Sequence, residues 1–111
     1  MLNDWEKVET IITKMAGKTP ADLKGYLFLI GVQTLGKGAR HFSKEQKQDL
    51  IHVAICEIFT LKGYYKFSHV DKDGWPHYDL TENLPHKKLF GQEELIKEQI
   101  IAYFRHHDLI E

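Results

Sequence analysis

The chain has 111 residues, of which 42% are hydrophobic and 28% charged, and its net charge is -1. This length and composition predict a single globular domain over residues 1–111 and exclude a largely disordered chain. The charge is uneven: residues 37–69 hold six basic and three acidic side chains, and residues 70–111 hold five basic and nine acidic ones. The near-neutral total nevertheless disfavours a protein that binds nucleic acid mainly through charge.

The first residues lack the basic stretch and apolar core of a signal peptide, and no apolar run approaches the length that spans a bilayer. The single cysteine, Cys56, cannot form an internal disulfide, which agrees with a reducing compartment. We therefore expect a cytoplasmic protein with no membrane segment.

Apolar side chains at spacings of three and four predict an amphipathic helix over residues 3–16, which Gly17 ends. A second helix is expected to follow at once. Thr19 is its predicted N-cap, with Pro20 at the first helical position and Asp22 near the positive end.

Residues 26–32 are apolar apart from Gly31, so the second helix is predicted to be the most buried element. A glycine at this place lets a neighbouring helix approach closely. A buried strand is the alternative, but the length and the start signal favour a helix that ends at Gly36.

The third helix is predicted over residues 44–62, the longest element. Ser43 and Gln46 form a capping box at its start, and Gly63 ends it. Its apolar residues form one stripe, while the charged residues fall mostly outside that stripe.

The segment from Tyr65 to Asp79 alternates in polarity on either side of an Asp-Lys-Asp-Gly turn, which predicts a hairpin with Gly74 in a left-handed conformation. Pro76 restricts its strand to a sheet edge. An irregular aromatic loop is the alternative, because a lone hairpin is marginally stable. A last helix is predicted over residues 91–106. The fold is therefore mainly α, a compact bundle of about four helices with a hairpin or an aromatic loop between the third and fourth.

The loop before the third helix carries basic side chains next to a helix N-terminus, where free amides and the helix dipole attract anions. This pattern indicates a weak anion site whose members are Lys37, Gly38, Arg40, Ser43 and Lys44. The spacing is not that of a nucleotide-binding P-loop. The alternative is a solvated loop with ordinary helix capping.

Two imidazoles and two carboxylates cluster within nine residues at the expected turn: His69, Asp71, Asp73 and His77. The spacing does not fit a calcium loop. The two histidines can face each other across a hairpin and bind a transition metal or a small ligand together with one carboxylate. The alternative is ordinary Asp-Gly turn chemistry. The aromatic residues around the cluster form either a second small core or an exposed patch for a partner.

His52 and Cys56 lie four residues apart and so share one face of the third helix. A neighbouring imidazolium can activate a thiol as a nucleophile. The alternative is simple packing, since cysteine is among the most buried residue types. His41 and His86 are further histidines that the fold can bring to the 69–77 cluster.

Four stretches carry a resemblance to known sequences: Gly31-Val-Gln-Thr-Leu-Gly-Lys-Gly38, residues 42–50, Gly63-Tyr-Tyr65, and Asp71 to His77 with its Asp-x-Asp-Gly-Trp-Pro-His pattern. With these, the chain resembles a group of small, uncharacterised, mostly helical bacterial proteins over roughly residues 23–104. The resemblance implies no activity, ligand or catalytic residue.

No complete catalytic constellation is present, so the sequence favours a non-enzymatic, cytosolic protein-interaction module that self-associates, with no cofactor. A winged-helix nucleic-acid binder is one alternative, because a helix followed by a hairpin resembles a recognition helix and its wing. A small ligand- or metal-binding domain that uses the 69–77 loop is the other.

Overall fold

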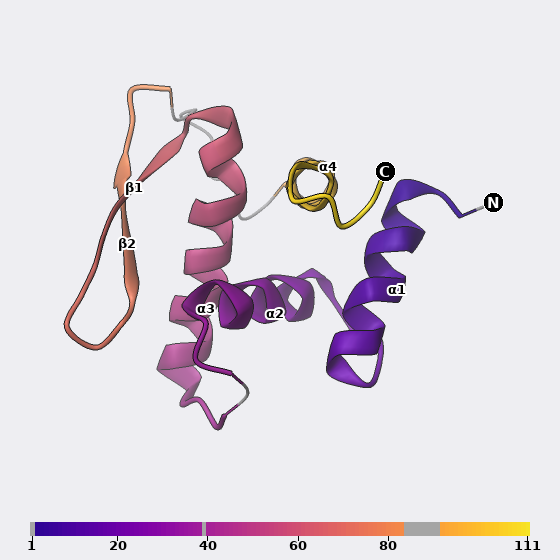
Figure 1. Ribbon diagram of the computed structural model, residues 1–111, viewed down its shortest axis with the longest axis horizontal. Helices are drawn as coiled ribbons and strands as arrows, with labels where there is room; N and C mark the ends of the chain where they lie inside the picture. Colours follow the sequence, from indigo (N-terminus) through magenta and orange to yellow (C-terminus); the bar gives the residue numbers. More distant parts are fainter. Residues whose placement is uncertain (1, 39, 84–91) are drawn as a thin grey trace.

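The computed structural model describes residues 2–38, 40–83 and 92–111, and in these residues it shows a mainly α-helical chain with one β-hairpin (Figure 1). The elements in chain order are α1 (Asp4–Ala16), α2 (Leu23–Leu35), α3 (Lys44–Phe59), the 3₁₀ helix η1 (Thr60–Lys62), β1 (Tyr65–Val70), β2 (Pro76–Leu80) and α4 (Glu93–His106). The predicted mainly α class and the hairpin between the third and fourth helices are confirmed. None of the described helices is long and apolar enough to cross a membrane.

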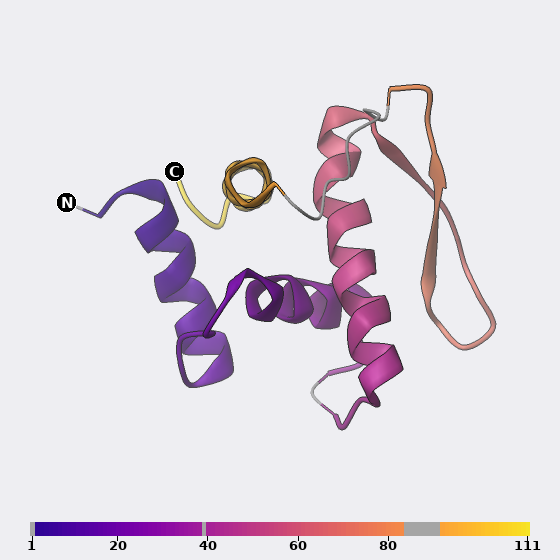
Figure 2. The ribbon, with the colours of Figure 1, turned by 180° about the vertical axis from the view of Figure 1, so that it is seen from behind.

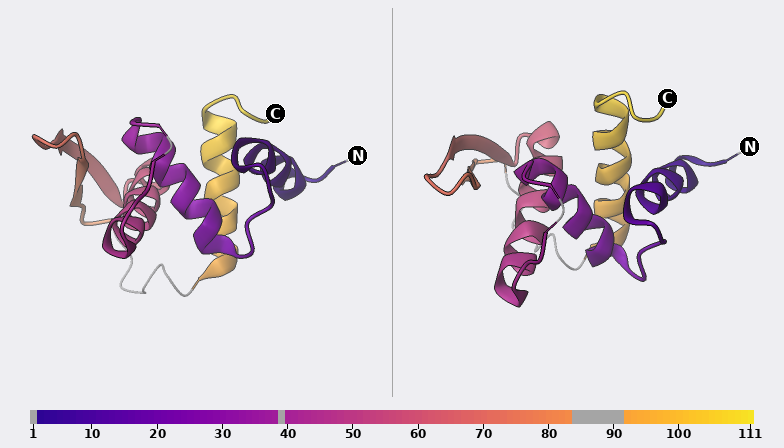
Figure 3. Two further views of the ribbon diagram at one scale, coloured as in Figure 1. Left: turned by 90° about the horizontal axis from the view of Figure 1, so that it is seen from below. Right: turned by 60° about the horizontal axis from the view of Figure 1, so that its bottom comes forward.

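Figure 1 shows α2 crossing α3 steeply, with the hairpin beside α3 and with α4 between α3 and α1. The view from behind in Figure 2 gives the same order. In Figure 3 the hairpin projects at one end of the molecule, and α1 and the C-terminus lie at the opposite end. The hairpin is therefore an appendage on a helical body.

The main core of that body joins all four helices. Val8 and Ile12 of α1 and Phe104 of α4 pack in one buried cluster with residues of α2 and α3. The other fully enclosed members of the cluster include Leu27, Ile55, Ile58, Phe59 and Ile100.

Helix α1 begins one residue later than predicted, because Asn3 is its N-cap. The Asn3 side chain accepts from the Glu6 amide at 2.8 Å, and the Glu6 carboxylate accepts from the Asn3 amide in return. Gly17 ends the helix in the left-handed region, at φ 80°, as predicted.

The predicted start of the second helix is wrong. Asp22, not Thr19, is the N-cap of α2, and its carboxylate accepts from the Gly25 amide at 3.0 Å. Thr19 instead hydrogen-bonds through its hydroxyl to the hydroxyl of Thr13 at 2.8 Å. Pro20 packs under the first turn of α2, where a Cβ on Gly25 would lie 2.7 Å from the Pro20 Cβ.

Helices α2 and α3 pack closely at Gly31, as the sequence predicted. A Cβ placed on Gly31 would lie 2.2 Å from the carbonyl oxygen of Leu50, so only glycine fits. A second small core forms beside this crossing. Leu35, Phe42 and Leu50 are buried in it, and Trp75 of the hairpin packs against them.

The capping box at the start of α3 is confirmed: the Ser43 hydroxyl accepts from the Gln46 amide at 3.1 Å, and the Gln46 side chain accepts from the Ser43 amide at 2.9 Å. The predicted 44–62 helix has a 3₁₀ last turn, η1, and Gly63 follows it at φ 73°. The chain then enters β1 within two residues, which places the hairpin beside α3.

The hairpin is antiparallel, with Tyr65 opposite Leu80 and Phe67 opposite Tyr78. Its register shifts between Phe67 and His69, and Gly74 takes φ 86° in the turn, as predicted. Burial raises the pKa of the Tyr78 hydroxyl, and the nearby Glu57 carboxylate of α3, which accepts a hydrogen bond from it, raises it further. Tyr78 thus fixes the hairpin to α3.

Helix α4 begins at Glu93, and Gly91, the predicted first residue, lies outside the described residues. The predicted end at His106 is confirmed. The buried Gln99 amide donates to the carbonyl of Ile58 at 2.7 Å, which ties α4 to α3. Asp108 takes φ 57° after the helix, and the Leu109 amide returns to the carbonyl of Phe104 at 2.9 Å.

Candidate functional site

The predicted 69–77 cluster forms the end of the hairpin, and the structure brings three of its four side chains together. His77 Nε2 donates to Asp71 Oδ2 at 2.8 Å. The rings of His69 and His77 stack nearly parallel, with centroids 4.8 Å apart. The side chain of Asp73 is not part of this group, but its backbone carbonyl accepts from the Lys37 ammonium.

Asp71 is the centre of the turn. Its Oδ1 accepts from the amides of Asp73 at 2.9 Å and Trp75 at 3.0 Å, while Oδ2 accepts from His77. The hydrogen bond from His77, followed by that from the Trp75 amide, lowers the pKa of Asp71 to about 2. The carboxylate is therefore ionised at neutral pH and is occupied in shaping the turn.

In the part of the chain that the structure describes, no group of three His, Cys, Asp or Glu side chains is placed to hold a metal ion. The Asp71–His77 pair supplies an imidazole oriented by a carboxylate, with Nε2 held towards Asp71. Such a pair can accept a hydrogen bond or supply one ligand to an ion.

A polar cleft of about 450 Å³ separates the hairpin turn from the amino-terminal half of α3. His52, the histidine of the His52–Cys56 pair on α3, lines this cleft together with Asp71 and His77. The lining residues are Gln46, Asp49, His52, Val53, Asp71, Trp75, Pro76 and His77. Sequence reasoning missed Gln46 and Asp49, although Asp49 lies three residues before His52 and so shares its side of α3.

The predicted anion loop is partly used by the fold. Lys37 is tied to the hairpin turn, and the Arg40 guanidinium lies 5.1 Å from the centre of the Phe42 ring. Ser43 caps α3, while Gly38, at φ 76°, and Lys44 are exposed. The fold thus already engages Lys37, Arg40 and Ser43, and anion binding at this loop stays a prediction.

His52 and Cys56 lie together as predicted, with Nε2 and Sγ 3.5 Å apart. Burial raises the pKa of the Cys56 thiol to about 12. The thiol is therefore protonated at neutral pH, the opposite of an activated nucleophile. His41 is exposed and does not line the cleft, and His86 lies outside the described residues.

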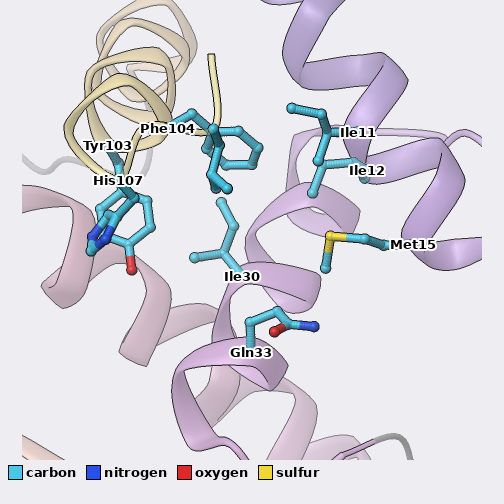
Figure 4. A pocket seen from close by; sticks show the side chains of 9 residues that line it. Ile11, Ile12, Met15, Ile30, Gln33, Tyr103, Phe104 and His107 are labelled. Atoms are coloured by element: carbon cyan, nitrogen blue, oxygen red, sulfur yellow. The ribbon is translucent and has the colours of Figure 1, made fainter.

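The structure contains a second hollow that sequence reasoning missed, an apolar groove of about 480 Å³ between α1, α2 and the end of α4 (Figure 4). The nine residues that line it are Ile11, Ile12, Met15, Ile30, Gln33, Tyr103, Phe104, His107 and Leu109. Only the helical apolar spacing of each segment was visible in the sequence. That spacing predicts which face of each helix is buried, but it does not predict the groove that forms between the helices.

Comparisons of the chain with protein-family models, with curated proteins and with solved structures found no match. Three features therefore carry the functional inference: the exposed hairpin, the polar cleft beside it, and the apolar groove at the other end of the body.

Proposed function

We propose that the protein is a non-enzymatic, cytoplasmic interaction module that associates with a second copy of itself through the hairpin. The observation that carries this proposal is the exposure of large apolar side chains there: Phe67 is 50% exposed, Val70 56% and Leu80 66%. Apolar residues gathered on a projecting element are typical of an interaction surface.

The backbone of the hairpin supports the same function. In the described residues the sheet has two strands, so each strand has one edge without a neighbouring strand. Free edges hydrogen-bond readily to a strand of another chain. None of the described helices covers Phe67 or Leu80, since both side chains are at least half exposed.

The sequence of β2 suits pairing with a second copy. If two β2 strands run antiparallel about Tyr78, His77 of each lies opposite Asp79 of the other. This register places no like charges opposite each other, which would destabilise the strand pair. Pro76 lacks an amide proton, but it stands at the end of the strand and costs at most one hydrogen bond.

Sedimentation velocity tests this proposal over protein concentrations from about 10 µM to about 1 mM, the range in which weak dimers form. The wild-type chain should shift towards a dimer. L80S and F67S should remain monomeric, while L61S, which removes a 39% exposed leucine outside the hairpin, should associate like the wild type. The proposal is contradicted if the wild-type chain is monomeric at every concentration, or if L61S loses dimerisation as fully as L80S and F67S do.

A winged-helix nucleic-acid binder is a second candidate, favoured by the steep crossing of α2 and α3 and by the hairpin that directly follows α3 (Figure 1). Lys44, Lys47 and Gln48 are exposed at the start of α3. This function is supported if a fluorescently labelled DNA duplex binds the wild-type protein with a strong salt dependence and binds the K44E/K47E variant only weakly. Absence of binding at low salt removes it.

A further inference from the structure

The two edges of the hairpin are not equivalent. Along β2 the pairing advances one residue at a time from Leu80 to Pro76, whereas along β1 it passes from Phe67 directly to His69. Ser68 is therefore an extra residue, and β1 carries a bulge opposite a regular β2. A bulge is one of the features by which proteins close a strand edge to further pairing.

The backbone groups of β2 that face away from β1 are regularly spaced. The Thr81 amide donates to the Tyr64 carbonyl at 3.1 Å, and hydrogen-bonded pairs alternate with non-bonded pairs along an antiparallel ladder. The backbone groups of Leu80, Tyr78 and Pro76 thus point outwards. Outside the strand ladder, neither the Leu80 amide nor the Tyr78 amide has a hydrogen-bond partner among the described residues.

The same alternation is broken on β1. Tyr65 is paired with Leu80, so its backbone groups also point outwards. At the other end the Asp71 amide donates to the Trp75 carbonyl at 2.9 Å, which makes Val70 the next outward residue. Outward groups recur at every second residue of a regular strand, but Tyr65 and Val70 are an odd number of positions apart. A strand that matched one half of the β1 edge would therefore miss the other half.

We propose that two copies join through their β2 edges into one four-stranded sheet, whose outer strands are the two bulged β1 strands. This inference rests on the association proposed above, and it adds the edge that is used and the reason that assembly stops at two copies. With the strands antiparallel about Tyr78, each Tyr78 amide donates to the Tyr78 carbonyl of the other copy, and each Leu80 amide donates to its Pro76 carbonyl. Pro76, which has no amide proton, is thus needed only as an acceptor.

The difference between the edges decides the symmetry of the assembly. Contact between two identical β2 edges is isologous and closes at the dimer. A contact between the β1 edge of one copy and the β2 edge of the next would be heterologous and would extend from copy to copy without limit. The bulge at Ser68 removes the regular β1 edge that this second mode needs.

Two matched proline variants test which edge is used. L80P and V70P each remove an exposed apolar side chain and an outward amide, from β2 and from β1 respectively, and an edge strand tolerates proline where the amide faces solvent. In sedimentation velocity L80P should remain monomeric, whereas V70P should dimerise like the wild type. The reverse result, or dimerisation of both variants, overturns the use of the β2 edge but leaves self-association standing. A monomeric wild type overturns both.

Deletion of Ser68 tests why assembly stops. Without this residue β1 would pair with β2 residue for residue. The wild type should reach a dimer and grow no further up to about 1 mM, whereas the deletion variant should form larger species whose size rises with concentration. S68A, which keeps the extra residue, should behave like the wild type. Wild-type species larger than a dimer, or a folded deletion variant that stops at the dimer, overturn the role of the bulge.

Amide exchange in the wild type needs no substitution and so covers the case in which a variant fails to fold. As the dimer forms, the outward amides of Tyr78 and Leu80 should exchange with solvent at least about tenfold more slowly, because they become hydrogen-bonded, whereas the outward amide of Val70 should be unaffected. Slowing at Val70 instead, or at neither edge of a dimeric protein, overturns the proposal.

Discussion

At the scale of single residues, Asp71 organises the end of the hairpin through three hydrogen bonds to one carboxylate. Each of these bonds is made by the ionised form, so the folded state favours ionisation. An unfolded chain offers the carboxylate none of the three. The pKa of Asp71 is therefore a direct measure of turn formation.

Acid should open the turn at an unusually low pH. The pKa of Asp71 is lowered from 3.8 to about 2 in the folded chain, so its contribution to stability is complete above about pH 4 and is lost as the pH falls towards 2. The amide signals of Asp73 and Trp75, followed by NMR, should titrate with a midpoint near 2. D71N should remove this transition, and a midpoint near 3.8 would show that the three bonds do not persist in solution.

Cys56 should react slowly with alkylating reagents. Its pKa of about 12 leaves almost no thiolate at neutral pH, and the side chain is only 2% exposed. Iodoacetamide should modify the folded protein far more slowly than free glutathione at the same pH, while urea should restore an ordinary rate. A folded-state rate above that of glutathione would revive the nucleophile hypothesis for the His52–Cys56 pair.

At the scale of the elements, the crossing of α2 and α3 depends on one missing side chain. Gly31 allows the α2 backbone to approach the Leu50 carbonyl more closely than any Cβ permits. Backbone atoms cannot move aside as the end of a flexible side chain can. The crossing in turn positions Phe42 and Trp75, and so the turn at the end of the hairpin.

Gly31→Ala should therefore be strongly destabilising. Overpacking against a backbone carbonyl should lower the free energy of unfolding by about 2 kcal/mol or more, despite the higher helix propensity of alanine. Urea denaturation followed by circular dichroism measures the change. Lys24→Ala, on an exposed position of the same helix, should change stability by no more than about 0.5 kcal/mol. A neutral Gly31→Ala would mean that the two helices are further apart than described.

Helix ends were predictable from sequence where one local signal stood alone. The Ser43–Gln46 box and Gly17 act within a single turn of helix, so their positions in the sequence suffice. The start of α2 was not predictable in this way, because Thr19 and Asp22 are both good N-cap residues. The hydroxyl of Thr19 is engaged by Thr13 of α1, a contact that depends on how the loop folds back.

At the scale of the whole molecule, the candidate sites join residues that are far apart in the sequence. The polar cleft brings His52 to His77, and the groove brings Ile12 to Phe104. Sequence periodicity gives the buried side of each helix but not the angle or distance between helices. The 69–77 cluster was predictable because a tight turn brings its members together locally, whereas the groove required the tertiary structure.

The hairpin and the helical body should differ in local stability. Few strand residues are even partly buried, whereas Ile55 and Ile58 of α3 are enclosed. In dilute solution, hydrogen-bonded strand amides should therefore exchange with solvent at least about tenfold faster than those of Ile55 and Ile58.

Raising the protein concentration should slow exchange in the hairpin and leave α3 unchanged, because pairing with a second copy covers the free strand edges. Hydrogen–deuterium exchange at two concentrations measures this difference, with L80S as the variant in which concentration should have no effect. Equal slowing in α3 would indicate that the copies meet through the helical body. Unchanged exchange everywhere would mean that the hairpin does not associate, and its exposed apolar residues would then need a different partner.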